Sequence, residues 1–535
     1  DKVVIEKFTL DRILAGVLGC LLCIQIFLLL FYNLRDTRTL INADAASAIY
    51  HFMEVIDNGT LNLPDWNHTT TLELDSAFLF AVPLYYVTHD MFLAMGLANG
   101  IFILLYFWVI YRIMKLNDIS LRWIFSVLIL TFTPWAVGML DYFNMMFYQA
   151  SQYTVKTLVP LVLILLVFQI MKFDFKDRKE RGEFIATLVT YTILLYSTSL
   201  STGIYTIVCG IFPIIMGVMY TGICNKFTRP KWIRLSCLLL YSGGIFLIGF
   251  MKYKELYPST SKYNLNITLA AEFWKNLCAN VVGFFQVLGA LPSMNVSGMS
   301  MQGIVLCVKF IFCIVLLACI LSGTRKLNFT QKQDLLNNLL TYICLVNLFI
   351  VTIYDTRYGS DVMQYRYYII MIIPLLILCG YRCEFYFKKM HKYQHGAFCC
   401  GFLAFLLVII VGNNRTVLGS LHNNDYAVTI CDYLDTLDVE SVIFIDDQDT
   451  TALCRGIDHS KKYGCFSSAE QQLQTQICTY QASNHGAFYG DKNVLAVVDG
   501  VNLEDVLPEE IARQYTLIGA VKWFNIYYCD HMLIP

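Results

Sequence analysis

Charged residues are scarce in this sequence. Only 15% of the 535 residues are Asp, Glu, Lys or Arg, whereas soluble domains carry about 25%. Hydrophobic residues make up 57% of the chain, and the mean hydropathy is +0.55. A soluble fold has too little interior for that much apolar surface, so the excess must face lipid. The net charge of −1 gives no electrostatic reason to expect a nucleic acid as a partner.

Several sequence signals are also missing. No small-residue cleavage site follows the first hydrophobic run, so we expect a retained span rather than a signal peptide. Of the 19 cysteines, most lie in or beside apolar segments, where cysteine behaves as a small hydrophobic residue. The spacing of the others matches no zinc pattern, and outside the cytoplasm they would allow one or two disulfides with at least one free thiol. These cysteines, all in the polar tail, are Cys431, Cys454, Cys465, Cys478 and Cys529.

Long hydrophobic runs are what the sequence has in abundance. A membrane-crossing helix needs about 20 mostly apolar residues. The segment 76–88 is apolar but short and contains Pro83, so it is interpreted as a re-entrant or interfacial segment. We expect about eleven crossings, at 13–33, 91–112, 119–138, 157–172, 184–200, 203–222, 234–251, 302–322, 335–354, 367–386 and 396–412.

The Lys and Arg residues between these runs predict the orientation. Basic residues concentrate in cytoplasmic loops, and the richest turn is KFDFKDRKERGE at 172–183. Counting 76–88 as a crossing would place that turn outside. The charge pattern therefore favours an odd number of crossings, a cytoplasmic N-terminus and an extracytoplasmic C-terminal tail.

The tail has the composition of a soluble domain. Buried strands are predicted at 439–447 and 493–500, and a closing strand at 520–529. Helices are predicted at 425–437 and 507–515. The predicted fold class is a polytopic α-helical membrane domain over residues 1–412, with a small extracytoplasmic α/β domain over residues 413–535.

An acidic cluster follows the first of these strands. Asp446, Asp447 and Asp449 stand where α/β folds often build ligand sites. A solvated turn explains the same residues.

The loop at 34–90 is the main candidate for a functional region. Its run DAASAIYHFMEVID fits a short amphipathic helix, with Asp44 at the N-terminal end. Asp44 is either a helix cap or a catalytic carboxylate at the bilayer surface. His51 and Glu54 share its polar face. They either join a metal or proton-relay site or are simply solvated.

The order of segments resembles a known superfamily. One span precedes a long outer loop that opens on an acidic residue, followed by the VPLYY run at 82–86 and then by many spans. Arg366, Tyr367 and Tyr368 with Pro374 stand near the last spans. This arrangement resembles the GT-C membrane glycosyltransferases, which include the protein O-mannosyltransferases and the lipid A aminoarabinose transferases. The acidic pair that follows the first span in the mannosyltransferases is not reproduced here.

The resemblance implies a reaction. The donor would be a hexose or pentose on a polyprenyl phosphate, and the acceptor a glycan, a lipid or a protein. Asp44 would act as the general base on the attacking hydroxyl, with inversion at the anomeric carbon. Cations must stabilise the leaving phosphate.

Four basic residues near the outer ends of spans could supply that charge. Arg366 is the first candidate, because a guanidinium group can bind a phosphate in a bidentate manner. Each of the four could instead anchor a helix end by snorkelling. The candidates are Arg366, Arg357, Lys156 and Lys252.

Asp141 opens the second outer loop. The resemblance implies that an acidic residue there can assist the first, and two carboxylates would suit a divalent cation such as Mg²⁺ or Mn²⁺. An ordinary helix-end aspartate is the alternative to this role.

Two other function classes fit a membrane protein of this kind. A transporter or flippase of a lipid-linked or small solute usually shows repeated halves and ionisable groups in the middle of its spans. No internal repeat is evident here, and the spans are nearly free of charge. A non-catalytic scaffold with a binding domain is the third class.

Overall fold

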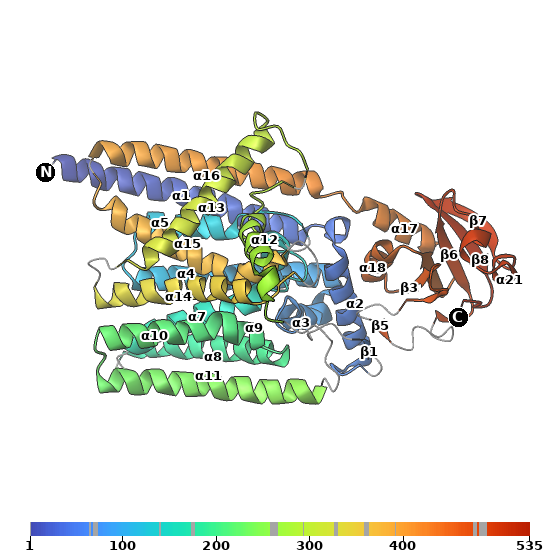
Figure 1. Ribbon diagram of the computed structural model, residues 1–535, viewed down its shortest axis with the longest axis horizontal. Coiled ribbons are helices and arrows are strands. Elements are labelled where there is room, and N and C mark those ends of the chain that lie inside the picture. Colours follow the sequence, from blue (N-terminus) through green and yellow to red (C-terminus); the bar gives the residue numbers. More distant parts are fainter. Residues whose placement is uncertain are drawn as a thin grey trace.

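Apolar helices that run side by side make up most of the molecule (Figure 1). We analysed a computed structural model of the 535-residue chain. It describes every residue except 1, 64–65, 68–72, 139–140, 173–176, 257–265, 293, 326–329, 358–362, 391, 475–478, 481–488 and 535.

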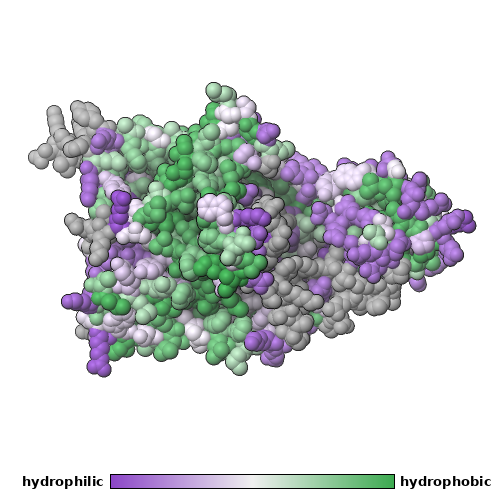
Figure 2. Space-filling view, in the orientation of Figure 1, coloured by the Kyte–Doolittle hydropathy of each residue, from purple (hydrophilic) through white to green (hydrophobic). Residues whose placement is uncertain are grey.

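Ten helices in the described part of the chain are long and apolar enough to cross a membrane. Green, hydrophobic atoms cover the helical part of the surface seen in Figure 2. The protein is therefore an integral, multi-pass membrane protein. The ten crossings are α1 (Lys2–Leu34), α4 (Met91–Leu116), α7 (Thr154–Lys172), α8 (Arg178–Leu200), α9–η2–α10 (Ile204–Thr206, Ile207–Ile211, Phe212–Cys224), α11 (Arg229–Leu256), α13 (Met301–Gly323), α14 (Gln331–Ile353), η4–α15 (Tyr365–Tyr368, Ile369–Phe387) and α16 (Lys392–Ser420).

The remaining predicted crossing, 119–138, is only partly helical. Helix α5 (Leu121–Phe132) has 12 residues and ends where Thr133 turns extended. Thr133 precedes Pro134, and a residue before proline is sterically disfavoured in the helical region. The helix packs against α1 and α15 inside the bundle. The segment 76–88 forms α3 (Phe78–Thr88), which is too short to cross, as predicted.

The bundle has two distinct ends. The domain end carries α2 (Ala43–Asn58), α3 and the C-terminal domain, whereas the N-terminus lies at the opposite end (Figure 1). We call that opposite end the basic end, because clustered Lys and Arg residues lie in or beside the turns α4–α5, α7–α8, α10–α11, α13–α14 and α15–α16. The smaller elements that complete the membrane part are η1 (Arg38–Leu40), β1 (Trp66–Asn67), α6 (Tyr142–Phe147), η3 (Ala270–Glu272) and α12 (Phe273–Gln286).

The C-terminal domain is a mixed six-stranded sheet with helices. Its strand order is β4-β3-β2-β6-β8-β7, in which β3, β2 and β6 run parallel and the other neighbours antiparallel. The predicted α/β class is therefore confirmed, while its limits at 413–535 stay a prediction. Its elements are α17 (Asp425–Asp435), β2 (Ser441–Ile445), α18 (Gln448–Ile457), β3 (Lys462–Ser467), β4 (Gln472–Leu473), β5 (Thr479–Tyr480), β6 (Asn493–Val498), α20 (Leu503–Val506), α21 (Glu509–Ala512), β7 (Thr516–Val521) and β8 (Phe524–Cys529).

The acidic cluster after β2 has structural partners. Asp447 caps α18 by accepting a hydrogen bond from the Thr450 amide at 2.9 Å. Asp446 accepts one from the Ser468 amide at 2.9 Å. The four tail cysteines that the structure describes, Cys431, Cys454, Cys465 and Cys529, are buried free thiols, and Cys478 lies outside the described residues.

The C-terminal domain docks directly onto α2 through α18. A Cβ atom added at Gly456 would lie 2.6 Å from the Cα atom of Ala46, so the two backbones touch. The Arg455 guanidinium lies 4.9 Å from the centre of the Tyr50 ring, and the His459 ring stacks on the same Tyr50 ring with 6.1 Å between ring centres. The contact with α18 therefore holds α2 in place against the C-terminal domain.

We expect Gly456→Ala to loosen this contact. The new methyl group meets backbone rather than a movable side chain, and overpacking of this kind costs about 1–3 kcal/mol. Hydrogen–deuterium exchange in α2 should become faster, and the unfolding temperature should fall. Gly419→Ala is the matched control, because nothing lies within 4 Å of a Cβ atom there. Equal exchange in the two variants would contradict the tight contact.

Candidate functional site

Asn42, and not Asp44, caps the N-terminus of helix α2. Asn42 is the N-cap residue, and its side chain accepts a hydrogen bond from the Ala45 amide at 2.8 Å. Asp44 lies inside the first turn, where a negative charge interacts favourably with the helix dipole. The helix cap considered for Asp44 is therefore supplied by Asn42 instead.

Asp44 lies within electrostatic reach of Arg366. Burial raises the pKa of the Asp44 carboxyl group, and the positive charge of Arg366 opposes that rise. Arg366 belongs to η4, the turn that leads into α15, and its guanidinium lies 5.9 Å from the centre of the Tyr367 ring. The first loop and a turn more than 300 residues later thus meet at the domain end.

Two further carboxylates, Glu73 and Asp75, lie in the loop before α3 and were not predicted from the sequence; the charges of Asp44 and Asp75 both act on Glu73. Asp75 is buried and forms an ion pair with Lys156 at 2.9 Å. Lys156 also donates to the Gln152 carbonyl at 2.6 Å, and the Gln152 side chain donates to Glu73 at 3.1 Å. These contacts join the loop before α3 to the start of α7. Lys156 is therefore already paired with a buried acid.

Glu73 is a neutral acid in this setting. Burial raises its pKa to about 8, the charge of Lys156 opposes the rise, and the charges of Asp44 and Asp75 add to it. Burial raises the pKa of Asp75 as well, with Lys156 again opposing. Neighbouring acids whose environments differ in this way are typical of active sites, because one can stay ionised while another holds a proton.

The backbone around these acids is strained. Glu73, Gln149, Ser151 and Thr202 all have φ between 46° and 82°, a region that residues other than glycine rarely adopt. The segments are in contact, since the Ala77 amide donates to the carbonyl of residue 150 at 2.8 Å. Such strain costs about 1–3 kcal/mol per residue and gathers at functional sites. It is independent support for a site here.

Asp141 also lies next to η4. Burial raises the pKa of Asp141, whereas a hydrogen bond from Tyr365 lowers it, with smaller contributions from the Gly138 amide and from Lys309. Tyr365 and Arg366 are consecutive residues of η4. One short turn therefore contacts Asp141 through Tyr365 and acts on Asp44 through Arg366.

The other predicted site residues have different surroundings. His51 is buried, and its ring stacks on Trp66 with 5.3 Å between ring centres. Glu54 accepts a hydrogen bond from Asn58, one helical turn later on the outer part of α2. His51 thus belongs to the aromatic packing of the loop, and the two side chains take part in different contacts.

Two of the candidate cations lie in ion pairs of their own. Arg357 is buried and binds Asp355 at 3.3 Å and Glu272 at 3.4 Å. Lys252 is paired with Glu255 at 2.8 Å on the exposed end of α11. Of the four predicted cations, Arg366 is the one whose charge acts on Asp44.

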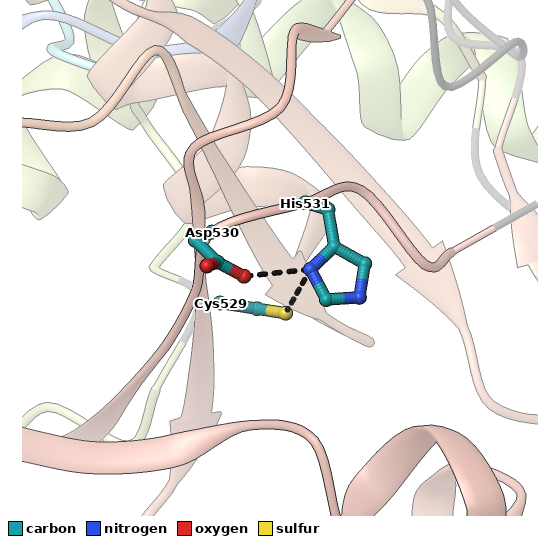
Figure 3. A group of neighbouring side chains, drawn as sticks. All are labelled: Cys529, Asp530 and His531. Atoms are coloured by element: carbon teal, nitrogen blue, oxygen red, sulfur yellow. Dashed lines mark hydrogen bonds and ion pairs between the residues drawn. The ribbon is translucent and has the colours of Figure 1, made fainter.

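A metal ion shared by Asp44 and Asp141 stays a prediction. Mg²⁺ is usually held by one or two carboxylates together with waters and substrate phosphates, and among the described residues no group of three His, Cys, Asp or Glu ligand atoms within 4.8 Å includes Asp44 or Asp141. The one such group among the described residues is Cys529, Asp530 and His531 in the C-terminal domain (Figure 3). There His531 Nδ1 lies 2.6 Å from Asp530 and 3.8 Å from the Cys529 sulfur. No step below involves a metal.

We expect the stability of the protein to depend on pH through Glu73. A carboxyl group whose folded pKa is raised stabilises the fold at low pH, and this contribution is lost as the pH rises from about 4.5 towards about 8. Thermal unfolding of the wild type should therefore move to lower temperature between about pH 5 and about pH 9. Glu73→Gln keeps the neutral form and should flatten this slope. An unchanged slope in the variant would show that Glu73 is already ionised in the fold.

Among known proteins, the chain is similar to solved structures in its overall fold, but no sequence match is found. No protein-family model and no curated protein matches the sequence. Among solved structures, the chain is similar to ArnT from Cupriavidus metallidurans in the apo state, with 10% identity and a TM-score of 0.44 over 96% of this chain and 98% of that one. It is also similar to ArnT bound to undecaprenyl phosphate, with 10% identity and a TM-score of 0.41 over the same shares. At these TM-scores no residue of this chain can be placed on a residue of those structures.

Proposed function

We propose that the protein is an inverting glycosyltransferase that moves a sugar from a polyprenyl-phosphate donor to an acceptor hydroxyl at the extracytoplasmic face of the membrane. The observation that carries the proposal is that Asp44 lies within electrostatic reach of Arg366 at the domain end of the bundle. A base and a cation are the two groups that this reaction requires. In this proposal the domain end is extracytoplasmic and the basic end cytoplasmic, in keeping with the positive-inside rule.

Asp44 removes the proton from the acceptor hydroxyl. The hydroxyl oxygen then forms a bond to the anomeric carbon of the donor from the face opposite the phosphate. The bond between that carbon and the phosphate oxygen breaks, and its electron pair leaves with the polyprenyl phosphate. The configuration at the carbon is inverted, and the proton remains on Asp44 until water accepts it.

Arg366 stabilises the charge that develops on the leaving phosphate. A guanidinium group offers two parallel donors to two phosphate oxygens. The same charge favours the ionised form of Asp44, because it opposes the rise in pKa that burial causes. Arg366 thus serves the base before the reaction and the leaving group during it.

Glu73 has a different role in this proposal. With a pKa of about 8 it is protonated at neutral pH, so it adds no second negative charge beside Asp44. Its Oε2 atom has no hydrogen-bond partner among the residues that the structure describes. A protonated Oε2 can donate to a hydroxyl group of the bound sugar. Asp141, held by Tyr365, would support η4 and with it Arg366.

The direct test is transfer by the purified protein. The protein is mixed with polyprenyl phosphates that carry labelled hexoses or pentoses and with glycan, lipid or peptide acceptors. We expect release of polyprenyl phosphate that requires both donor and acceptor. Uptake of a solute into proteoliposomes without any sugar donor, together with no sugar transfer from any donor, would overturn the proposed enzymatic function and support a transporter.

A further inference from the structure

The basic end contains a pocket that the proposed reaction does not use. It has a volume of about 250 Å³ and lies between the ends of four helices, α4, α7, α11 and α14. Those ends are far from α2, the helix at the domain end whose first turn contains Asp44 (Figure 1). The lining residues are Leu116, Phe168, Met171, Lys172, Lys231, Gln331, Lys332 and Leu335.

The charged residues that line the pocket are all basic. Three lysines from three different helices, Lys172, Lys231 and Lys332, meet around the pocket, and none of the described residues that line it is a carboxylate. The other lining residues are apolar apart from Gln331. Converging ammonium groups over an apolar floor suit an anion that is attached to an apolar body.

The present partners of these lysines are weak and replaceable. Lys332 pairs with Asp118 at 3.1 Å, but the Asp118 side chain is 79% exposed, and an exposed pair of this kind contributes little. Lys231 lies 3.4 Å from the Gln331 side-chain oxygen and 5.4 Å from the centre of the Phe227 ring. Neither Gln331 nor Phe227 carries a charge that could neutralise Lys231.

The position of the pocket decides between a soluble anion and a lipid. It opens where four spans end, which is the level of the headgroups of a bilayer. Basic pockets between transmembrane helices on the cytoplasmic side bind the phosphates of anionic lipid headgroups. A soluble phosphate has no apolar part that could contact the apolar residues of the pocket floor, which are Leu116, Phe168, Met171 and Leu335.

We propose that this pocket binds the phosphate headgroup of an anionic phospholipid from the leaflet at the basic end. The three ammonium groups contact the phosphate oxygens, and the apolar floor contacts the glycerol and the first carbons of the acyl chains. This inference is independent of the proposed transfer reaction, because it involves none of the residues at the domain end.

The test is lipid binding to the full-length protein in a neutral detergent, followed by native mass spectrometry. Dioleoyl phosphatidylglycerol should bind with a saturable constant, and dioleoyl phosphatidylcholine should bind at least tenfold more weakly. The Lys172→Gln, Lys231→Gln, Lys332→Gln triple variant should lose at least tenfold in affinity for phosphatidylglycerol. The triple arginine variant at the same positions should keep the binding, which separates lost charge from lost fold.

A matched control removes the same charge elsewhere. Lys115→Gln, Lys179→Gln, Lys389→Gln changes three exposed lysines at the basic end that do not line the pocket, and its affinity should stay within about twofold of wild type, since screened surface charges act weakly. Equal losses in the two triple variants would overturn the site, because they would show a general charge effect. Displacement of the lipid by millimolar inorganic phosphate alone would overturn the assignment to a lipid.

Discussion

Asp44→Asn should abolish sugar transfer while leaving the protein folded. Asparagine keeps the size of the side chain but cannot accept a proton, and general base catalysis typically contributes about 10²–10⁴-fold to the rate. We therefore expect kcat to fall by about that factor with little change in KM for the donor. The measurement is release of polyprenyl phosphate under saturating donor and acceptor.

Stability separates a catalytic role from a structural one. Burial raises the pKa of Asp44, so the ionised form is less stable in the fold than in water. Asp44→Asn removes that cost, and its unfolding temperature should equal or exceed that of wild type. The wild-type rate should also fall as the pH drops through the raised pKa, because the base is then protonated.

The matched control for this variant lies on the same helix. Asp57 is exposed at the end of α2, so Asp57→Asn makes the same chemical change away from the site. We expect its transfer rate to match that of wild type. Transfer by Asp44→Asn at the wild-type rate would remove Asp44 from the mechanism.

The membrane architecture could be predicted because it depends on local composition. Runs of about 20 apolar residues identify crossings, since every backbone polar group in lipid must be satisfied within the segment. The shortening of α5 depends on Thr133 and Pro134, and the pattern of hydrophobicity alone does not show it. The β-strands of the tail were predictable for a similar reason, as their five- or six-residue apolar runs are buried.

The site could be predicted only in part. Asp44 could be predicted because it opens an amphipathic helix in the loop after the first span, and Arg366 because it stands at the outer end of a span. Glu73 and Asp75 also stand next to an apolar run, that of α3, but a pair of acids in a loop is usually solvated. Their burial depends on Lys156, which is 81 residues further along the chain from Asp75. Contacts over that distance come from tertiary packing, which a single sequence does not reveal.

Lys156→Met should strongly destabilise the fold. The side chain of Asp75 is 1% exposed and that of Lys156 is 13% exposed, so their ion pair is almost removed from water. Methionine fills a similar volume but leaves the Asp75 charge uncompensated, and breaking a buried pair in this way costs about 3–5 kcal/mol. The measurement is the unfolding temperature in detergent. A shift as small as that of an exposed pair, such as Lys252 with Glu255, would show that water reaches Asp75.

The double variant Lys156→Met, Asp75→Asn should recover most of the loss. Removing both charges leaves a neutral pair, and replacing a buried ion pair with neutral groups is often harmless. The pH dependence has a definite sign. Without Lys156 the pKa of Asp75 rises further, and a carboxyl group with a raised folded pKa stabilises the fold only below that pKa. The defect of Lys156→Met should therefore shrink as the pH falls, whereas the double variant should lack this dependence. Lys156 also lowers the pKa of Glu73, and the charge of Asp75 raises it. The pH dependence that survives in the double variant therefore comes from Glu73, and its difference from wild type measures the coupling between the ion pair and Glu73.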